Sequence, residues 1–428
     1  MKTKVLIIGA GITGLSTAYH MEKLGKKDYI VAERGPACGG LCASVRQDGF
    51  TFDYSGHVIH TQNPYTRDLL KKLLGKNTNL VKRRAWIYVQ DTLVPFPFQA
   101  NLSYLKEDVV AECVSRLMKA SKQKKKKTNN FKEWALSVYG EGICKYFMLP
   151  YNEKLWQINA DELSTTWCST FVPKTNLEDI IKGAYFKQKG VFGYNPIFFY
   201  PKEGGAQALP DAMAKKVKNL LLNTEITSID FDTKTAYTKD GQIEFEKLVN
   251  TTPLKTFIPM CKGLDKKYEK TAANLTSNKV YVLNIGINRV VQDTSWVYFP
   301  EQKYPFYRVG VQSSFSAKVA PKDCSSLYIE CAFKETDKEP DLKKLQTQIL
   351  TALKETGFIR EEDKILTALW LKIAPAYPSY NLEREVFTGK ILTALGKYKC
   401  VSAGRYGAWE YSFIEKSILE GKEIAEKL

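Results

Sequence analysis

The stretch KVLIIGAGITG, residues 4–14, decides how the chain begins to fold. Its first five residues are almost all apolar and rich in β-branched side chains, which predicts a parallel strand buried on both faces. Gly9, Gly11 and Gly14 follow at G-x-G-x-x-G spacing. The first glycine permits a tight turn, the second lets the backbone approach a pyrophosphate, and the third lets the next helix pack on the strand. A helix over residues 12–24 is predicted, its N-terminal N–H groups facing the phosphates.

A second apolar strand, residues 29–32, ends at Glu33, an acidic residue at the distance expected for a ribose ligand. The competing interpretation is a glycine-rich turn with Glu33 as a solvated strand end. Arg34 and the doublet Gly39-Gly40 follow, with residues 41–44 behind them. This arrangement resembles the FAD-binding signature of amine-oxidase-like flavoproteins and favours a retained flavin over an exchanging nicotinamide cofactor. The predicted cofactor ligands here are Gly9, Gly11, Gly14, Glu33, Arg34, Gly39, Gly40, Leu41 and Ser44.

Composition narrows the class of protein. A chain of 428 residues is too long for one ordinary core and predicts two or three domains. The net charge of +17 suits an anionic small molecule or loose attraction to an acidic membrane surface. Nucleic acid is disfavoured, because no recognised binding motif accompanies the charge. No segment approaches the ~18 consecutive apolar residues of a membrane span.

The cysteines and histidines exclude further classes. Nine cysteines are scattered without disulfide or metal-ligand spacing, so we expect no metal, reduced thiols and a cytoplasmic protein without a cleavable signal. Three histidines disfavour a zinc enzyme or a Ser-His-Asp hydrolase. His57 follows Gly56 on a loop behind the cofactor motif, which favours a place against the flavin ring. For His60, a packed strand residue and a flavin neighbour stay equally open.

The rest of the chain predicts a second and a third region. We expect an α/β fold, in which a Rossmann-like FAD-binding domain carries a helical insertion and an antiparallel β-sheet substrate domain. The predicted elements are a strand over 84–94, helices within 102–167, a helix over 206–221, a β-meander over 224–250 with a turn at Asp240-Gly241, a helix over 342–356, a strand over 399–403 and a helix over 412–428. The predicted domains are 1–80 with 203–255 and 392–428 for FAD, 101–190 for the helices, and 81–100 with 191–202 and 278–391 for the sheet.

Ten further motifs occur in one order along most of the chain. They are GHVI (56–59), PFPFQ (95–99), YNEKLW (151–156), LSTTW (163–167), YPKEGG (200–205), WVYFPE (296–301), PFYR (305–308), YP (377–378), LERE (382–385) and GRYGAWEY (404–411). Together they resemble the UDP-galactopyranose mutases, especially the eukaryotic type, whereas H-x-x-H-T at residues 57–61 is similar to the bacterial branch.

The resemblance implies an isomerase, an intramolecular transferase that keeps FAD reduced, with NADPH or NADH as candidate reductants. In that family the flavin N5 atom attacks the anomeric carbon of a UDP-hexopyranose, and the flavin–sugar adduct recloses to the furanose. It also implies galactofuranose supply for cell-surface polysaccharide, a UDP-sugar as partner and no integral membrane segment. The sequence leaves the oligomeric state open.

The family's site residues carry over position by position. Those implied to form the uridine pocket are Phe96, Phe98, Gln99, Phe147, Tyr151, Asn152 and Trp156. Asn195 and Tyr298 are implied substrate contacts, and Arg308, Tyr377 and Tyr411 are implied diphosphate ligands. Arg405 is expected where flavin and substrate meet, and Gly404, Arg405 and His57 are implied cofactor ligands. The implied catalytic residues are His57, Arg308 and Arg405. For any single aromatic residue, a place in the core is the competing interpretation.

Three positions depart from the family pattern. Phe171 replaces a diphosphate-binding arginine, Phe315 replaces a tyrosine, and Glu415 replaces an asparagine, while Lys174 is a candidate substitute for the lost arginine. These changes put the sugar and the nucleotide in question. An alternative function therefore stays open: an amine-oxidase-like FAD oxidoreductase acting on a small amine or a C–C bond. A third is a flavoprotein that binds a nucleotide sugar without turning it over.

Overall fold

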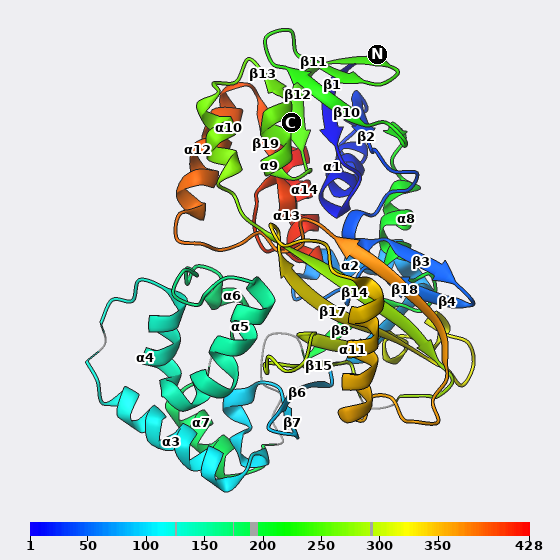
Figure 1. Cartoon of the computed structure of the whole chain (residues 1–428). Coiled ribbons are helices and arrows are strands. Elements are labelled where there is room, and N and C mark those ends of the chain that lie inside the picture. The colour runs from blue at the N-terminus through cyan, green and yellow to red at the C-terminus, as the bar shows by residue number, and fades with distance from the viewer. Residues whose placement is uncertain (125, 174, 189–195, 292–293) are drawn as a thin grey trace.

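The computed structural model describes residues 1–124, 126–173, 175–188, 196–291 and 294–428. Two large sheets and a group of helices set to one side make up these residues (Figure 1). The first sheet carries both chain ends close to it, and the helical group lies beside the second sheet. The α/β class predicted from the sequence is confirmed.

The first sheet has the strand order β13-β10-β11-β12-β1-β2-β9, and β19 pairs with β12 as well. Its strands are β1 (Lys2–Ile8), β2 (Tyr29–Ala32), β9 (Leu220–Leu221), β10 (Ile226–Asp230), β11 (Thr235–Thr238), β12 (Gly241–Asn250), β13 (Cys261–Lys262) and β19 (Cys400–Ser402). The central strands are parallel, with Ile7 opposite both Val31 and Val249. Leu6 and Ile7 are fully buried, as expected of a strand covered on both faces.

Helices cover both faces of this sheet. On one face lie α1 (Ile12–Lys23), α2 (Pro64–Leu74), α8 (Ala208–Ala214) and α14 (Ile414–Lys427), which share a core with Ile7. On the other face, α9 (Leu254–Phe257), α10 (Lys267–Ala273) and α12 (Arg384–Lys397) share a core with Leu6. The alternation of Leu6 and Ile7 between two cores follows from the period of two in a strand.

The second sheet has the order β18-β14-β17-β16-β15-β6-β7. Its strands are β6 (Ala85–Val89), β7 (Thr92–Pro95), β14 (Asn278–Ile287), β15 (Trp296–Tyr298), β16 (Arg308–Val311), β17 (Ser325–Lys334) and β18 (Ile365–Ile373). All neighbouring pairs are antiparallel except β15 with β6, which is parallel. The helix α11 (Leu342–Glu355) packs on one face of this sheet.

The helical group contains α3 (Glu107–Ser121), α4 (Phe131–Ile143), α5 (Leu149–Trp156), α6 (Cys168–Phe171) and α7 (Leu177–Tyr185). Apolar residues of these helices and of β6 and β7 form one buried core, so the helices are anchored to the edge of the second sheet. Two two-stranded antiparallel sheets complete the described strands: β3 (Ser44–Gln47) with β4 (Phe50–Asp53), and β5 (Thr78–Lys82) with β8 (Ile197–Pro201).

Two predicted elements need correction. The helix predicted over 206–221 ends at Ala214, because Leu220 and Leu221 leave it to pair with Val31 and Ala32 as a sheet strand. The strand predicted over 84–94 is a hairpin of β6 and β7, turned at residues 90–91 where both φ angles are positive. The helix over 12–24 and the meander over 224–250 are confirmed, and the predicted domain boundaries stay a prediction.

Candidate active site

One cavity of about 1120 Å³ runs from the glycine motif of the first sheet to the helical group and the second sheet. Most residues named from the sequence line it: Gly9, Gly11, Glu33, Arg34, Gly39, Gly40, Leu41, Ser44, His57, Phe96, Gln99, Phe147, Tyr151, Asn152, Trp156, Tyr298, Arg308, Tyr377, Arg405 and Tyr411. Phe98, Gly14 and Gly404 do not line it, and Asn195 lies outside the described residues.

The glycine motif shapes the first end of the cavity. Gly9 has a φ of +96°, which favours glycine, and the N–H of Gly39 donates to the carbonyl of Ala10 at 2.8 Å. A Cβ on Gly14 would lie 2.0 Å from the carbonyl oxygen of Gly9, so this glycine serves the packing of α1 on the strand. A Cβ on Gly11, in contrast, would meet no protein atom within 4 Å. The space beside Gly11 is therefore free for a ligand, which is where a pyrophosphate is expected.

Glu33 is held at the rim of that space. Its carboxylate accepts a hydrogen bond from the backbone N–H of Ala10 and another from that of Gly35, each at 2.8 Å. The side chain thus ties the end of β2 to the glycine loop while it lines the cavity. A carboxylate fixed in this way is suited to accept hydrogen bonds from ribose hydroxyls. The residues present therefore fit a dinucleotide.

His57 lies at the middle of the cavity on the loop after β4. Its Nδ1 atom is buried and has no hydrogen-bond partner among the residues that the structure describes. Burial lowers the pKa of His57 to about 4, and the nearby Arg405 guanidinium adds to the effect. The ring is therefore neutral near pH 7, with an unused nitrogen beside a ligand-sized space. His60 also lines the cavity, and its Nδ1 lies 3.4 Å from the carbonyl of Ile197.

Arg308 was predicted as a diphosphate ligand, and the structure gives it a protein partner. Its Nε and Nη2 atoms contact the fully buried Glu330 carboxylate at 2.6 and 2.7 Å, and Nη2 also donates to Ser55 Oγ at 3.2 Å. Burial alone would raise the pKa of Glu330, but the guanidinium holds it below its ordinary value. Arg308 Nη1 is left without a partner among the described residues, and this nitrogen alone stays available to an anion.

Arg405 is the second residue of the short helix α13 (Gly404–Gly407). Its guanidinium lies over the rings of Tyr377 and Tyr411, 4.8 and 5.1 Å from their centroids, and donates to the carbonyls of Ala376 and Ser412. No carboxylate pairs with Arg405 among the described ion pairs, so its charge faces the cavity uncompensated. Gly404 has a φ of +77°, and a Cβ there would lie 2.5 Å from Thr13 Oγ1. Gly404 therefore lets this turn approach α1.

Aromatic rings make the far wall. Phe147 stacks on Tyr151 at 5.2 Å between ring centroids, and Tyr298 meets Tyr151 edge-on at 5.2 Å. Phe98 is fully buried and stacks behind Phe147 at 5.4 Å, so its place is in the core and not on the cavity surface. Phe96 lies 5.5 Å from Tyr298. The wall offers flat apolar surfaces of the kind on which a nucleobase stacks.

Several buried polar atoms of the cavity lining lack partners among the described residues, Trp167 Nε1 and Trp296 Nε1 among them. Two belong to wall residues named from the sequence: Gln99 Oε1, an acceptor, and Trp156 Nε1, a donor. The amide nitrogen of Gln99 is fixed by the carbonyl of Pro173 at 3.2 Å, and that of Asn152 by the carbonyl of Met148 at 2.7 Å. Because buried polar atoms are nearly always paired in folded proteins, these two indicate a ligand with matching groups.

The three departures from the family pattern have different surroundings. Phe171 lines the cavity and lies 4.1 Å from Tyr411, ring to ring. Phe315 is fully buried against Phe198 and Tyr200, away from the cavity lining. Glu415 lines the cavity and accepts hydrogen bonds from the Thr61 hydroxyl and from the backbone N–H of Asn63. Lys174 lies outside the described residues.

Sequence reasoning missed Glu330, Ser55 and Tyr328. The hydroxyl of Tyr328 is buried without a partner among the described residues, and its side chain lines the cavity. The signal for Glu330 was a lone carboxylate inside the apolar strand β17, since an unpaired buried charge is costly. Among the described residues, no cluster of three or more His, Cys, Asp or Glu side chains is placed to hold a metal ion. Within the same residues, no helix has the length and apolar character needed to span a membrane.

The chain belongs to the flavin-containing amine oxidoreductase family, whose profile matches residues 12–427. A flavin is therefore the cofactor class that fits both the family and the glycine cradle. Within this class, the whole chain is similar to a crystal structure of reduced UDP-galactopyranose mutase, with a TM-score of 0.94 and 29% identity over 99% of this chain and 95% of the other. The resemblance predicted from the motifs is confirmed.

Other relatives match over a smaller share of the chain or at lower identity. A dTDP-fucopyranose mutase of Escherichia coli is 26% identical over 202 residues, which is 46% of this chain and 52% of that protein. The chain thus spans about half the length of this curated relative in the match. A coproporphyrinogen III oxidase of Bacillus subtilis is 33% identical over 104 residues, 22% of each chain. A putative protoporphyrinogen oxidase structure shares the fold, with a TM-score of 0.77 and 16% identity.

Proposed function

We propose that this chain is a flavin-dependent mutase, an isomerase that interconverts the pyranose and furanose forms of a UDP-hexose, UDP-galactose or a related sugar. The observation that carries the proposal is one continuous cavity that joins the glycine cradle to an aromatic wall holding an unpaired buried acceptor and donor. A nucleotide sugar needs both ends of such a cavity, whereas a small amine needs only the flavin end. The similarity to mutases of UDP-galactopyranose and dTDP-fucopyranose supports it.

The base and ribose would bind at the aromatic wall. The rings of Phe147, Tyr151 and Tyr298 supply stacking surface, and Phe96 closes the wall on one side. Gln99 Oε1 would accept from an N–H of the base, as in uracil, and Trp156 Nε1 would donate to an oxygen of the ligand. Because both atoms are buried, the ligand that pairs with them relieves a cost that the empty protein bears.

The diphosphate would bind between the wall and the flavin. Arg405 supplies an uncompensated charge, and the phenols of Tyr377 and Tyr411 line the cavity around it. Arg308 would contribute through Nη1 only, since Glu330 and Ser55 occupy its other donors. Charge-assisted hydrogen bonds of this kind suit the non-bridging oxygens of a departing and returning UDP.

FAD would be held by the glycine cradle, Glu33, Arg34 and the loop through Ser44. When bound and reduced, with NADPH or NADH as the candidate reductant, the flavin would supply a nucleophilic ring nitrogen for the anomeric carbon. The chain's own work is to place the sugar, to stabilise charge on UDP through Arg405 and to exclude water with the aromatic wall. Neutral His57 would contribute an uncharged ring against the flavin rather than a proton.

A second candidate function is oxidation of a small amine or a C–C bond by the same flavin site. The ring of Phe171 on Tyr411 favours it, because this contact puts apolar surface at a position where the mutase pattern has an arginine. The family profile and the porphyrinogen oxidase relatives fit it as well. It leaves the unpaired Gln99 and Trp156 atoms without a ligand group, which is why the mutase is preferred.

The test is turnover by the purified, FAD-loaded chain under anaerobic conditions. With chemically reduced flavin, UDP-galactopyranose or dTDP-fucopyranose should give a furanose product on chromatography, and the same protein with oxidised flavin should give none. Hydrogen peroxide formed from an amine, with no furanose from either nucleotide sugar, would replace the mutase by the oxidase. Supply of galactofuranose for cell-surface polysaccharide, by a protein working in the cytoplasm, belongs to the same proposal.

A further inference from the structure

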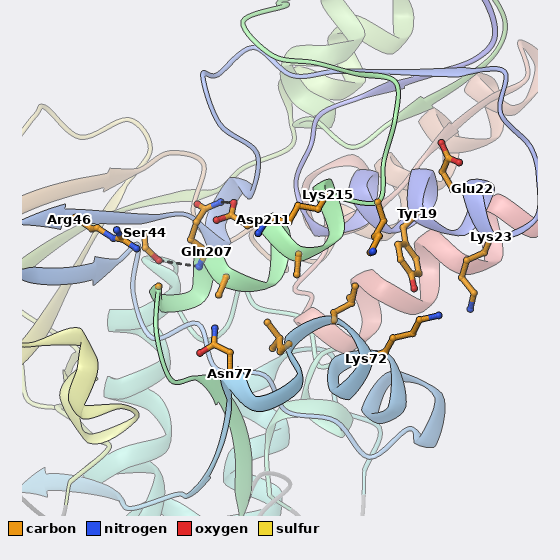
Figure 2. Close-up of a pocket in the computed structure, with 16 residues that line it drawn as sticks. Tyr19, Glu22, Lys23, Ser44, Arg46, Lys72, Asn77, Gln207, Asp211 and Lys215 are labelled. Atoms are coloured by element: carbon orange, nitrogen blue, oxygen red, sulfur yellow. Dashed lines mark hydrogen bonds between the residues drawn. The ribbon is translucent and has the colours of Figure 1, made fainter.

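A second cavity, of about 960 Å³, adjoins the flavin cavity (Figure 2). Ser44 and Gln207 line both cavities and so stand between them, and the backbone N–H of Gln207 donates to Ser44 Oγ at 3.1 Å. The other walls are the helices α1, α2 and α8. This second cavity shares no other residue with the first, so it is a separate site on the flavin-binding side of the molecule.

The second cavity is lined by an excess of positive charge. Five basic side chains face two carboxylates: Lys23, Arg46, Lys72, Lys215 and Lys216 against Glu22 and Asp211. Both carboxylates already accept hydrogen bonds, Glu22 from the Tyr29 hydroxyl and Asp211 from the Gln207 amide, each at 2.7 Å. Arg46, Lys72, Lys215 and Lys216 have no side-chain hydrogen bond or ion pair with any residue in the described ranges. These four cations are thus unpaired around a concave surface, while Lys23 Nζ donates to the Tyr65 hydroxyl at 3.4 Å.

Tyr19 is the second observation that points to a ligand. Its side chain is only 4% exposed, and its hydroxyl has no hydrogen-bond partner in the part of the chain that the structure describes. Burial raises the pKa of Tyr19, so the hydroxyl stays a donor. Figure 2 shows this hydroxyl directed into the same space as the ammonium ends of Lys23 and Lys72. The hydroxyl of this buried tyrosine and two ammonium groups aimed at one space are donors for an anion.

We infer that this second cavity binds a small molecule with two or more phosphate groups, such as a nucleotide or an inorganic polyphosphate, separately from the flavin and the substrate. Several spread ammonium and guanidinium donors match several phosphates better than one carboxylate. Leu73, Leu74 and Ala208 give the cavity an apolar part for an organic group. Its concave form suits a small molecule rather than a flat membrane surface. Because Ser44 and Gln207 line both cavities, a ligand bound in the second cavity would change the position of the flavin-binding loop through these two residues.

The experiment titrates the FAD-loaded full-length protein with inorganic triphosphate and with ATP by calorimetry, each in the absence and presence of saturating UDP. We expect saturable binding at one site that UDP leaves unchanged, together with a shift in the flavin absorbance spectrum. The double variant Lys72→Gln/Lys216→Gln should weaken triphosphate binding about tenfold or more, and Tyr19→Phe about threefold, because each removes donors from the cavity.

The matched control is Lys343→Gln/Lys344→Gln, which removes two exposed lysines from α11 far from the cavity lining. It should keep the wild-type affinity, and an equal loss in both double variants would reduce the effect to net charge and overturn the site. Displacement by UDP, or loss of binding in Arg405→Ala alone, would place the triphosphate in the flavin cavity and also overturn it. Binding of anionic lipid vesicles without saturable triphosphate binding would assign these lysines to a membrane instead. None of these outcomes depends on mutase turnover.

Discussion

The two ends of the main cavity are built in different ways. The flavin end is built around two short stretches near the N-terminus, residues 9–13 and 33–44, with residues 224–226 and 251–253 beside them, and its glycines act through the backbone. The aromatic end collects side chains from the segment after β7, from the segment 147–156 that includes α5, and from β15 and β16, which are far apart in the sequence. The first end is fixed by local steric fit and the second by packing between distant segments. Substitutions at the first end should therefore act through steric clashes, and those at the second end through lost side-chain contacts.

The largest expected effect comes from glycines of the flavin end. Gly14→Val would drive a side chain into the carbonyl of Gly9, where even a Cβ comes within 2.0 Å, so we expect loss of soluble, folded protein. Gly11→Val places its side chain in open space, so the chain should fold with little change in Tm but lose flavin. Expression, thermal melting and flavin absorbance after gel filtration measure both.

The two glycine variants test whether Gly14 is needed for folding and Gly11 for flavin binding. A Gly11→Val protein that keeps its yellow colour through gel filtration would show that the pyrophosphate does not approach this glycine. A well-folded Gly14→Val protein would mean that α1 can shift away from β1 without cost. Either result would break the contrast between a backbone-built end and a side-chain-built end.

The next effect concerns the aromatic end and its buried ion pair. Glu330→Gln leaves the Arg308 guanidinium without its buried counter-charge, and removal of one partner from such a pair costs about 3–5 kcal/mol. Urea unfolding of the purified protein measures the loss in the free energy of unfolding. The control is Glu178→Gln, because Glu178 pairs with Lys182 on the exposed face of α7, and an exposed ion pair contributes about 0–1 kcal/mol. Equal losses in the two variants would contradict the buried pair.

The glycine cradle and the Arg308–Glu330 ion pair show what the sequence could and could not predict. The glycine cradle was predictable because G-x-G-x-x-G acts within one βαβ unit, where neighbours in sequence are neighbours in space. Arg308 was placed correctly at the cavity, but its partner Glu330 was not named, because strand pairing sets which residue lies opposite. Phe98 was expected at the ligand and lies in the core, since aromatic type alone does not tell a wall from its support. The helix predicted over residues 206–221 was too long for a similar reason, since Leu220 pairs with a neighbouring strand despite the helical pattern of the sequence.

A smaller effect belongs to His57, where the two ends meet. Its folded-state pKa of about 4 lies below the ordinary 6.5, so the unfolded chain binds more protons between these pH values. The free energy of unfolding should therefore fall as pH drops from 6.5 towards 4. Because the ring lines an open cavity that admits water, we expect about 1–2 kcal/mol of this loss by pH 5. Urea unfolding of wild type and His57→Asn at pH 7 and pH 5 isolates it, and identical pH dependence in both proteins would exclude His57 as the cause.

The smallest effect concerns Phe171, a cavity residue that departs from the mutase pattern. Phe171→Arg would put a guanidinium beside Tyr411, close to the charge of Arg405. If a diphosphate binds there, the added charge-assisted hydrogen bond should tighten UDP binding about five- to tenfold, or about 1–1.4 kcal/mol, in calorimetry. Phe171→Leu removes the ring without adding charge and should leave UDP affinity unchanged or weaker. Weaker binding in Phe171→Arg than in Phe171→Leu would mean that Arg405 repels the new cation with no phosphate between them. The diphosphate would then have to lie elsewhere, and the oxidase would become the better account of this end of the cavity.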